Sequence, residues 1–210
     1  MIRTTALALL VTVGFGFNAL AQEAAPETPK APGQELAETI CVACHGADGT
    51  SVSTDPLYPH LAGQGADYMI KQLKDFKAGR RNDPLMSAMA SVVATEQDER
   101  DIAAWYTKQV VKPSQATNVE LVDRGRQLWR AGDAAKGVPA CAGCHGASGH
   151  GLPAQYPRLA GQIPEYIAVQ LQKFRNAERI NDPESMMRII AERLNDHDLK
   201  AVSEYAAGLR

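Results

Sequence analysis

The feature that most constrains this chain of 210 residues is an internal duplication. Three stretches of the first half recur in the second half in the same order, at offsets of 98 to 100 residues. They are CVACHGA at 41–47 and CAGCHGA at 141–147, YPHLAGQ at 58–64 and YPRLAGQ at 156–162, and NDP at 82–84 and 181–183. Such a repeat predicts two similar domains. We place them at residues 33–112 and 118–210, with a polar linker at 113–117.

The first 32 residues have the pattern of an exported precursor. A positive start at Arg3 precedes an apolar run over residues 6–20 and an Ala-x-Ala site that ends at Ala21. This pattern predicts a signal peptide over residues 1–21. Residues 22–32 are rich in Ala, Pro and Glu, which is typical of a flexible tail. We therefore expect a mature protein that works outside the cytoplasm.

Composition narrows the class of protein. Hydrophobic residues make up 45% of the chain and charged residues 22%, as in a soluble globular protein. The 22 Lys and Arg residues are balanced by 24 Asp and Glu residues. A nucleic-acid binder needs an excess of basic residues, so we expect no nucleic-acid partner.

Apolar periodicity and helix-start signals predict an all-α fold, because no segment shows the alternation of a β-strand. We expect three main helices in each half, joined by long loops. Pro164 suits a first helical turn, and Thr95 and Asn195 each precede by three residues an Asp that can complete a capping pattern. The expected helices cover residues 34–44, 67–77 and 98–108, and then 119–131, 164–176 and 196–208.

The chemistry is concentrated in two Cys-x-x-Cys-His motifs. Two cysteines at this spacing on a helical turn lie on one side, and the His that follows faces the same object. This is the attachment signature of c-type haem, in which two thioethers and an imidazole hold one macrocycle. The motif residues are Cys41, Cys44 and His45, and Cys141, Cys144 and His145. Two copies predict two covalently bound haem c groups.

Three other readings of the cysteines explain less. A structural zinc site would join two separate domains and leave the adjacent histidines unused. A thioredoxin-like dithiol expects a βαβ setting, which the pattern does not contain. Plain disulfides suit an exported protein but do not explain the histidines.

Each haem iron needs a second axial ligand besides His45 or His145. Four of the six Met residues lie in two equivalent windows after the Asn-Asp-Pro motifs. A thioether paired with His raises the reduction potential of haem. We select Met86 in the first half and Met187 in the second. Within each window the other Met, Met89 or Met186, is a packing residue or the alternative ligand.

A ligating imidazole normally donates its second N–H to a fixed acceptor. The carbonyl groups of Pro59 and Pro157, in the matched loops, are our candidates for this role. Arg81 and Arg179 stand just before the Asn-Asp-Pro motifs, where a guanidinium can pair with a haem propionate, although a surface position is the plainer reading.

The remaining histidines and the two tryptophans receive simpler interpretations. His60, His150 and His197 have no counterpart in the other half, and we expect all three to face solvent. Trp105 and Trp129 are expected to pack in the core or against haem.

Taken together, these features resemble the cytochrome c4 family of dihaem c-type cytochromes, over the whole mature chain. The resemblance implies a periplasmic location. The resemblance implies two class I cytochrome c folds that face each other across a pseudo-twofold axis, with haem propionates toward the interface and His/Met ligation at both irons. Family spacing places the ligand seven residues before Leu194, at Met187, whereas gap-free counting between the halves pairs Met86 with Met186. Ala94 stands where that Leu is usual in the first half, so Met89 remains open.

The resemblance also implies a function and its partners. Electrons would pass from a quinol-oxidising complex, a donor cytochrome or a copper protein to a terminal oxidase, with loose membrane association. The protein would be an electron carrier and not an enzyme. A dihaem peroxidase is the alternative, and a haem subunit fixed in an oxidase complex is a third reading. Residues 33–112 hold 8 Lys and Arg against 11 Asp and Glu, and residues 118–210 hold 12 against 11, which suggests different partners for the two halves.

Overall fold

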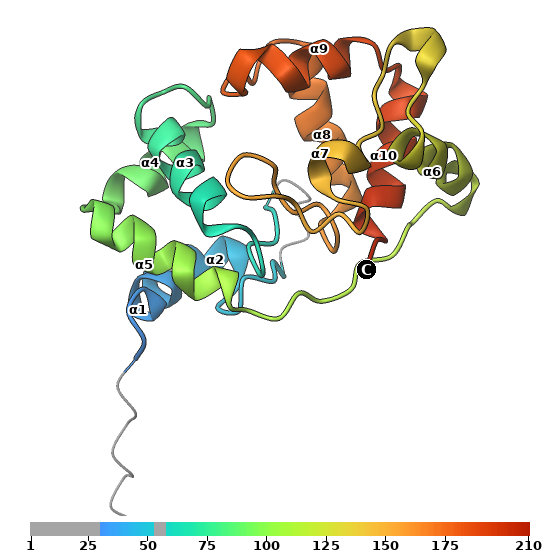
Figure 1. Cartoon of the computed structure of the whole chain (residues 1–210). Coiled ribbons are helices and arrows are strands. Elements are labelled where there is room, and N and C mark those ends of the chain that lie inside the picture. Colours follow the sequence, from blue (N-terminus) through green and yellow to red (C-terminus); the bar gives the residue numbers. More distant parts are fainter. Residues whose placement is uncertain (1–29, 53–57) are drawn as a thin grey trace, which may run out of the picture.

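The computed structural model describes residues 30–52 and 58–210 of the chain. The predicted signal peptide at 1–21 and most of the tail at 22–32 lie outside these residues. Two helical halves lie side by side and are joined by an extended linker along one edge (Figure 1). None of the helices in residues 30–52 and 58–210 combines the length and the hydropathy that a membrane span requires.

The first half begins with a continuous helical rod that ends at the first Cys-x-x-Cys-His motif. The rod consists of α1 (Gln34–Leu36), the π-helical segment η1 (Ala37–Cys41) and α2 (Val42–His45). Three further helices follow: α3 (Ala66–Lys77), α4 (Pro84–Val92) and α5 (Glu96–Thr107). α3 packs against both α4 and α5.

The second half repeats this order with an added turn. It comprises the 3₁₀ segment η2 (Val119–Leu121), α6 (Val122–Arg130), the 3₁₀ segment η3 (Ala134–Lys136), α7 (Ala142–His145), α8 (Pro164–Arg175), the 3₁₀ segment η4 (Pro183–Ser185), α9 (Met186–Glu192) and α10 (Asp196–Ala207). A loop that contains η3 separates α6 from α7, whereas the first half runs straight into its motif.

The predicted all-α fold and the predicted helix starts are confirmed in the described residues, where the β-pairing consists of isolated bridges. Thr95 forms a capping box with Asp98 at the start of α5. Asn195 accepts a hydrogen bond from the Asp198 backbone at the start of α10. Pro164 occupies the first turn of α8, where its missing N–H leaves no bond unmade.

The expectation of three main helices per half was wrong, because each methionine window is itself a helix. Asp83 caps α4 by accepting a hydrogen bond from the Met86 backbone at 3.0 Å. In the second window, Asp182 accepts from both the backbone and the guanidinium of Arg188 on α9. The periodicity of α4 is hidden because apolar residues also occupy its exposed face: Leu85, Met89 and Val92.

A glycine lets the terminal helices of each half cross at close range. A Cβ atom on Gly33 would lie 2.1 Å from the carbonyl oxygen of Asp101 on α5. A Cβ atom on Gly125 would lie at the same 2.1 Å from the carbonyl oxygen of Ala201 on α10. Only a residue without a side chain permits this contact. The two glycines therefore mark equivalent points, and the extra turn of the second half falls between this crossing and its motif.

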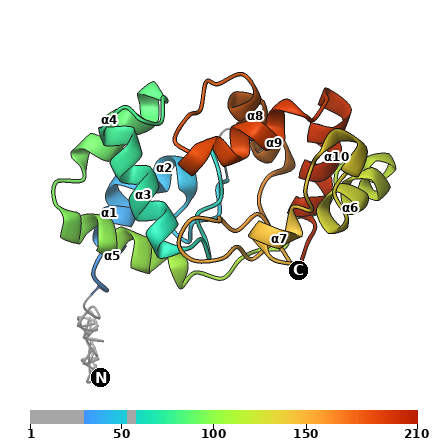
Figure 2. The same cartoon turned by 45° about the horizontal axis from the view of Figure 1, so that its top comes forward.

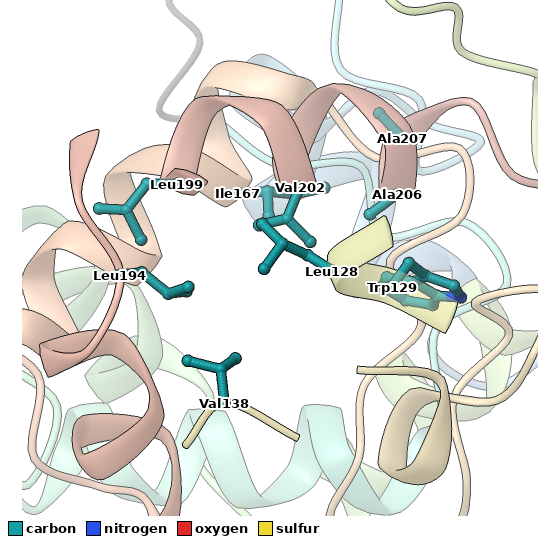
Figure 3. Packing of buried hydrophobic residues seen from close by; sticks show 9 residues of the cluster. All are labelled: Leu128, Trp129, Val138, Ile167, Leu194, Leu199, Val202, Ala206 and Ala207. Carbon is teal, nitrogen blue, oxygen red and sulfur yellow. The ribbon is translucent and has the colours of Figure 1, made fainter. Parts of the chain in front are cut away.

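The two crossings are filled by opposite choices of large and small residue. In the first half, Ala37 on the N-terminal rod packs in one cluster with Tyr106 on α5, and both are fully buried. In the second half, Trp129 on α6 packs in one cluster with Ala206 on α10 (Figure 3). Each pair provides one aromatic ring and one methyl group, so both cores are filled although the residues differ.

The helix crossings lie at the two outer ends of the molecule. Figure 2 shows α1 and α5 at one end and α6 and α10 at the other, as Figure 1 does. α7 and the loops that follow it lie toward the middle in both views. The groups that carry the chemistry are therefore placed between the two helical ends.

Candidate functional site

Each Cys-x-x-Cys-His motif presents a buried imidazole held by a backbone carbonyl. His45 ends α2 and its Nδ1 lies 2.8 Å from the carbonyl oxygen of Pro59. His145 ends α7 and its Nδ1 lies 3.0 Å from the carbonyl oxygen of Pro157. A carbonyl only accepts, so Nδ1 is the protonated nitrogen in both rings. The predicted acceptors are confirmed, and each ring keeps an unprotonated Nε2.

Burial keeps both imidazoles neutral. It lowers the pKa of His45 and of His145, although the hydrogen bonds to Pro59 and Pro157 act in the opposite direction. Nδ1 and Nε2 point in divergent directions from one ring, and Nδ1 is already engaged. A neutral imidazole with a free Nε2 lone pair is the form that binds a metal.

The four cysteines of the motifs are free and partly buried. Burial raises the pKa of Cys141 to about 11 and raises that of Cys41. In the described part of the chain, no three side chains of His, Cys, Asp or Glu gather as a metal-binding group. The donor set in each half is thus a pair of thiols beside one imidazole, which suits thioether attachment of a macrocycle.

One cavity of about 290 Å³ extends between the two halves and contains both motifs on its walls. Its lining is mainly apolar and comes from α3 and α8, from the methionine windows, from the terminal helices and from the loops that follow each motif. The apolar lining includes Leu61, Leu73, Phe76 and Ile102 from the first half and Leu159, Leu171, Phe174 and Val202 from the second. An apolar wall with a few directed polar groups is typical of a cofactor site.

Three of the four methionines in the two windows reach this cavity. Met86 lines it, whereas Met89 is 36% exposed and does not. This difference favours Met86 as the ligand in the first half. Met186 and Met187 both line the cavity, so contact with it does not separate them. With a thiol pair, an imidazole and a thioether in each half, the residues present fit haem c.

The sequence of the whole chain matches proteins of this chemistry. The cytochrome c family model matches residues 30–110 and 122–209. Cytochrome c4 of Thiocapsa roseopersicina is 45% identical over 192 residues, which cover 90% of this chain and 97% of that protein.

The chain belongs to the cytochrome c4 family.

Solved and curated relatives agree with this assignment. The crystal structure of reduced recombinant cytochrome c4 from Pseudomonas stutzeri is 39% identical, covers 85% of this chain and 97% of its own, and superimposes with a TM-score of 0.79. A thiosulfate dehydrogenase electron acceptor of Stutzerimonas stutzeri strain A1501 is 36% identical over 180 residues, with 84% of this chain and 82% of that protein covered. As a cytochrome c4, the chain is a dihaem c-type electron carrier with two tandem cytochrome c domains and two covalently bound haem c groups.

The structure corrects three expectations for polar residues. Arg81 and Arg179 are not surface charges, since they are only 8% and 7% exposed. His60 does not simply face solvent, because its Nδ1 accepts a hydrogen bond from the Ser51 backbone at 3.0 Å. These residues are covered by the opposite half of the cytochrome, which no local pattern reveals. His150 and His197 are exposed, as expected.

The two tryptophans follow the prediction in different degrees. Trp129 is fully buried, and its Nε1 donates to the carbonyl oxygen of Ala147 at 3.1 Å. Trp105 is partly buried, and its Nε1 donates to the matched carbonyl of Ala47 at 3.2 Å. The indoles come from different helices but fasten the same position after each motif. The matched carbonyls were the signal that sequence reasoning missed.

Proposed function

We propose that this cytochrome works in the periplasm, where it carries electrons from a quinol-oxidising complex or a small redox donor to a terminal oxidase. When bound, each haem iron takes up and releases one electron. The observation that carries the proposal is the matched His–carbonyl clamp of the two halves, His45 with Pro59 and His145 with Pro157. Both sites are built alike, which is expected of an electron carrier. A dihaem enzyme with one catalytic site and one electron-transfer site would have two different sites.

The proposed axial pairs are His45 with Met86 and His145 with Met187. The hydrogen bonds to Pro59 and Pro157 hold the imidazoles in one orientation. The methionines reach the cavity from α4 and α9. A haem iron held by one imidazole and one thioether would have no coordination position for a substrate. This arrangement supports electron transfer without chemistry on a bound molecule.

The spectrum of the oxidised holoprotein tests this proposal against a dihaem peroxidase. Two Met-ligated haems give a sulfur-to-iron charge-transfer band of full intensity for two sites, and peroxide is not turned over. A band of half intensity together with peroxide turnover would assign the peroxidase function instead. Co-purification with an oxidase complex would identify a fixed subunit, and free release from spheroplasts would identify a mobile carrier.

The predicted signal peptide supports the periplasmic location, and the N-terminus of the mature protein tests it. Cleavage after Ala21 leaves Gln22 as the first residue. Sequencing of the haem-loaded protein from the periplasmic fraction should find this N-terminus. A chain that retains residues 1–21 in the cytoplasmic fraction would contradict the location.

The partners are proposed from charge and from one relative. Residues 33–112 carry a net negative charge and residues 118–210 a small net positive charge, which favours a different partner for each half. A relative named as an electron acceptor of thiosulfate dehydrogenase supports a donor enzyme as one class of partner. Stopped-flow rates of electron entry and exit should depend differently on ionic strength. Identical dependence would remove the support from charge.

A further inference from the structure

Two arginines in matched positions meet at the junction of the two halves. Arg81 and Arg179 each precede an Asn-Asp-Pro motif, and their backbones pair as an antiparallel bridge. Both side chains are buried, and both line the cavity that contains the two motif histidines. Two guanidinium groups are thus held inside the molecule, between the two haem sites.

Each guanidinium is positioned by an aromatic ring of its own half. The Arg81 Cζ atom lies 4.6 Å from the centroid of the Phe76 ring, at the end of α3. The Arg179 Cζ atom lies 4.5 Å from the centroid of the Phe174 ring, at the end of α8. Stacking on a ring face orients the plane of the guanidinium and leaves its N–H groups free to donate at the edges.

The hydrogen bonds of Arg81 cross the interface. Its Nη2 donates to the Tyr166 hydroxyl at 2.9 Å and to the Gln170 Oε1 at 3.0 Å, both in the second half. Its Nη1 donates to the Gln72 Oε1 at 2.9 Å in its own half. All three acceptors are uncharged.

Arg179 repeats this pattern in the opposite direction. Its Nη2 donates to the Tyr68 hydroxyl at 3.0 Å and to the Gln72 Oε1 at 3.2 Å, and its Nη1 donates to the Gln170 Oε1 at 2.8 Å. The amide oxygens of Gln72 and Gln170 therefore each accept from both arginines. The two cations belong to one network that neither half contains alone.

Neither guanidinium forms an ion pair in the described residues, although the carboxylate of Asp83 acts on Arg81 from more than 4.0 Å away. No carboxylate lies within 4.0 Å of either guanidinium in residues 30–52 and 58–210. Burial and the neighbouring charge of Arg81 lower the pKa of Arg179, but an arginine starts from so high a pKa that it stays charged at neutral pH. A buried charge without a counter-charge is strongly unfavourable. The carboxylates of bound haem, its propionates, would supply a direct counter-charge inside the cavity.

We propose that Arg81 and Arg179 form one cationic site that the propionates of both haem groups share, and that this site sets the two reduction potentials together. A cation near a haem favours the state with the additional electron. Because each guanidinium is bonded across the interface, its charge acts on both haems and not only on the haem of its own half. The proposal requires two bound haems but does not depend on which methionines are the ligands. An error in the ligand assignment would therefore leave it standing.

A redox titration of the dihaem holoprotein tests the shared site. Arg81→Gln and Arg179→Gln each remove one cation, and Arg126→Gln removes an exposed cation from α6 as a control. Each cavity variant should lower the reduction potentials of both haems. The expected shift is about 59 mV per haem, which is a tenfold change in the ratio of reduced to oxidised protein. A shift of one potential only, or of neither beyond the control, overturns the proposal. Altered unfolding with unchanged potentials would show that the arginines only join the halves.

Gln72→Glu tests the same site without removing a cation or a packed side chain. Its near-isosteric carboxylate keeps the oxygen that accepts from both arginines and adds the counter-charge internally. The new carboxylate should displace propionate charge from Arg81 and Arg179 and lower the reduction potentials of both haems. Potentials equal to those of the unaltered protein would overturn the proposal even if the arginine variants fail to load haem.

Discussion

The side-chain amide of Gln64 pairs with the backbone of Arg158 in the other half of the molecule. Its Nε2 donates to the Arg158 carbonyl at 3.0 Å, and its Oε1 accepts from the Arg158 N–H at 2.8 Å. Gln162 makes the same two bonds to the backbone of His60, at 2.9 and 3.0 Å. His60 and Arg158 directly follow the prolines that hold the motif histidines. Contact between the halves and orientation of the imidazoles are therefore linked in one pair of loops.

Loss of one of these glutamines should loosen the interface. Gln162→Leu removes the two hydrogen bonds to the backbone of His60 and a third from the Ile163 N–H, and it leaves these backbone groups without their partner. We expect a loss of about 2 to 4 kcal/mol in the free energy of unfolding. Denaturation followed separately at the haem bands of each half should then give two transitions.

The control for this variant is Gln97→Leu, on the exposed surface of α5. It should change the free energy of unfolding by less than about 0.5 kcal/mol. If Gln162→Leu unfolds in one coincident transition with unchanged midpoint, the loop pairing does not hold the halves together.

The methionine windows should separate into ligands and packing residues. Met86→Ala and Met187→Ala should each remove about half of the sulfur-to-iron band and lower one reduction potential, because a thioether raises it. Met89→Ala, at a side chain that is outside the cavity, should leave the band intact. Full loss of one haem's band in Met186→Ala, with Met187→Ala unaffected, would transfer the assignment to Met186.

The crossing of α6 and α10 should not tolerate a methyl group. Gly125→Ala places a Cβ atom 2.1 Å from a backbone oxygen that cannot move aside without shifting α10. We expect a loss of at least about 3 kcal/mol despite the helix propensity of alanine. Thermal unfolding of the haem-loaded protein measures the change.

Gly143, a glycine with open space around it, provides the control for this substitution. A Cβ atom on Gly143 would meet no atom within 4 Å, and Ala43 stands at the equivalent place in the first half. Gly143→Ala should be neutral or should stabilise α7 by up to about 1 kcal/mol. Equal destabilisation by the two variants would show that close helix approach is not the cause.

A buried carboxylate should make the second half sensitive to acid. Asp198 on α10 is 2% exposed and accepts from Arg124 Nε at 2.8 Å and from Lys136. Burial alone would raise the pKa of Asp198, but the hydrogen bonds from Arg124 and Lys136 lower it below its usual value. A lowered folded-state pKa stabilises the protein above the unfolded value, near pH 4, and this stability is lost as the pH falls through the folded-state pKa.

Asp198→Asn should therefore cost about 3 kcal/mol at pH 7, and the difference from the unaltered protein should shrink as the pH falls below about 4. Melting temperatures measured from pH 7 to pH 3 follow this effect. Asp123→Asn, at a side chain that is 84% exposed, should show no such dependence. A constant difference across this pH range would mean that the charge of Asp198 is not what joins α6 to α10.

The features that could be predicted before the fold was known all depend on short stretches of chain. The duplication, the haem motifs, the capping residues Thr95 and Asn195 and the carbonyl acceptors of the histidines all depend on residues close in sequence or repeated in register. Local spacing also placed the methionines in their windows. The helices around them escaped prediction because the exposed face of α4 is apolar and does not show the usual periodicity.

The burial of polar residues follows from how the two halves dock, which no stretch of sequence reveals. Arg81 has the sequence surroundings of a surface charge, and its burial arises from Tyr166 and Gln170, about 85 to 89 positions away along the chain. The large and the small residue also change places between the two helix crossings, from Ala37 with Tyr106 to Trp129 with Ala206. This relationship can be seen only when the crossing helices are in place. Burial depends on what the opposite half places over a residue, and that physical quantity is set by the docking of two surfaces and not by the order of residues in either one.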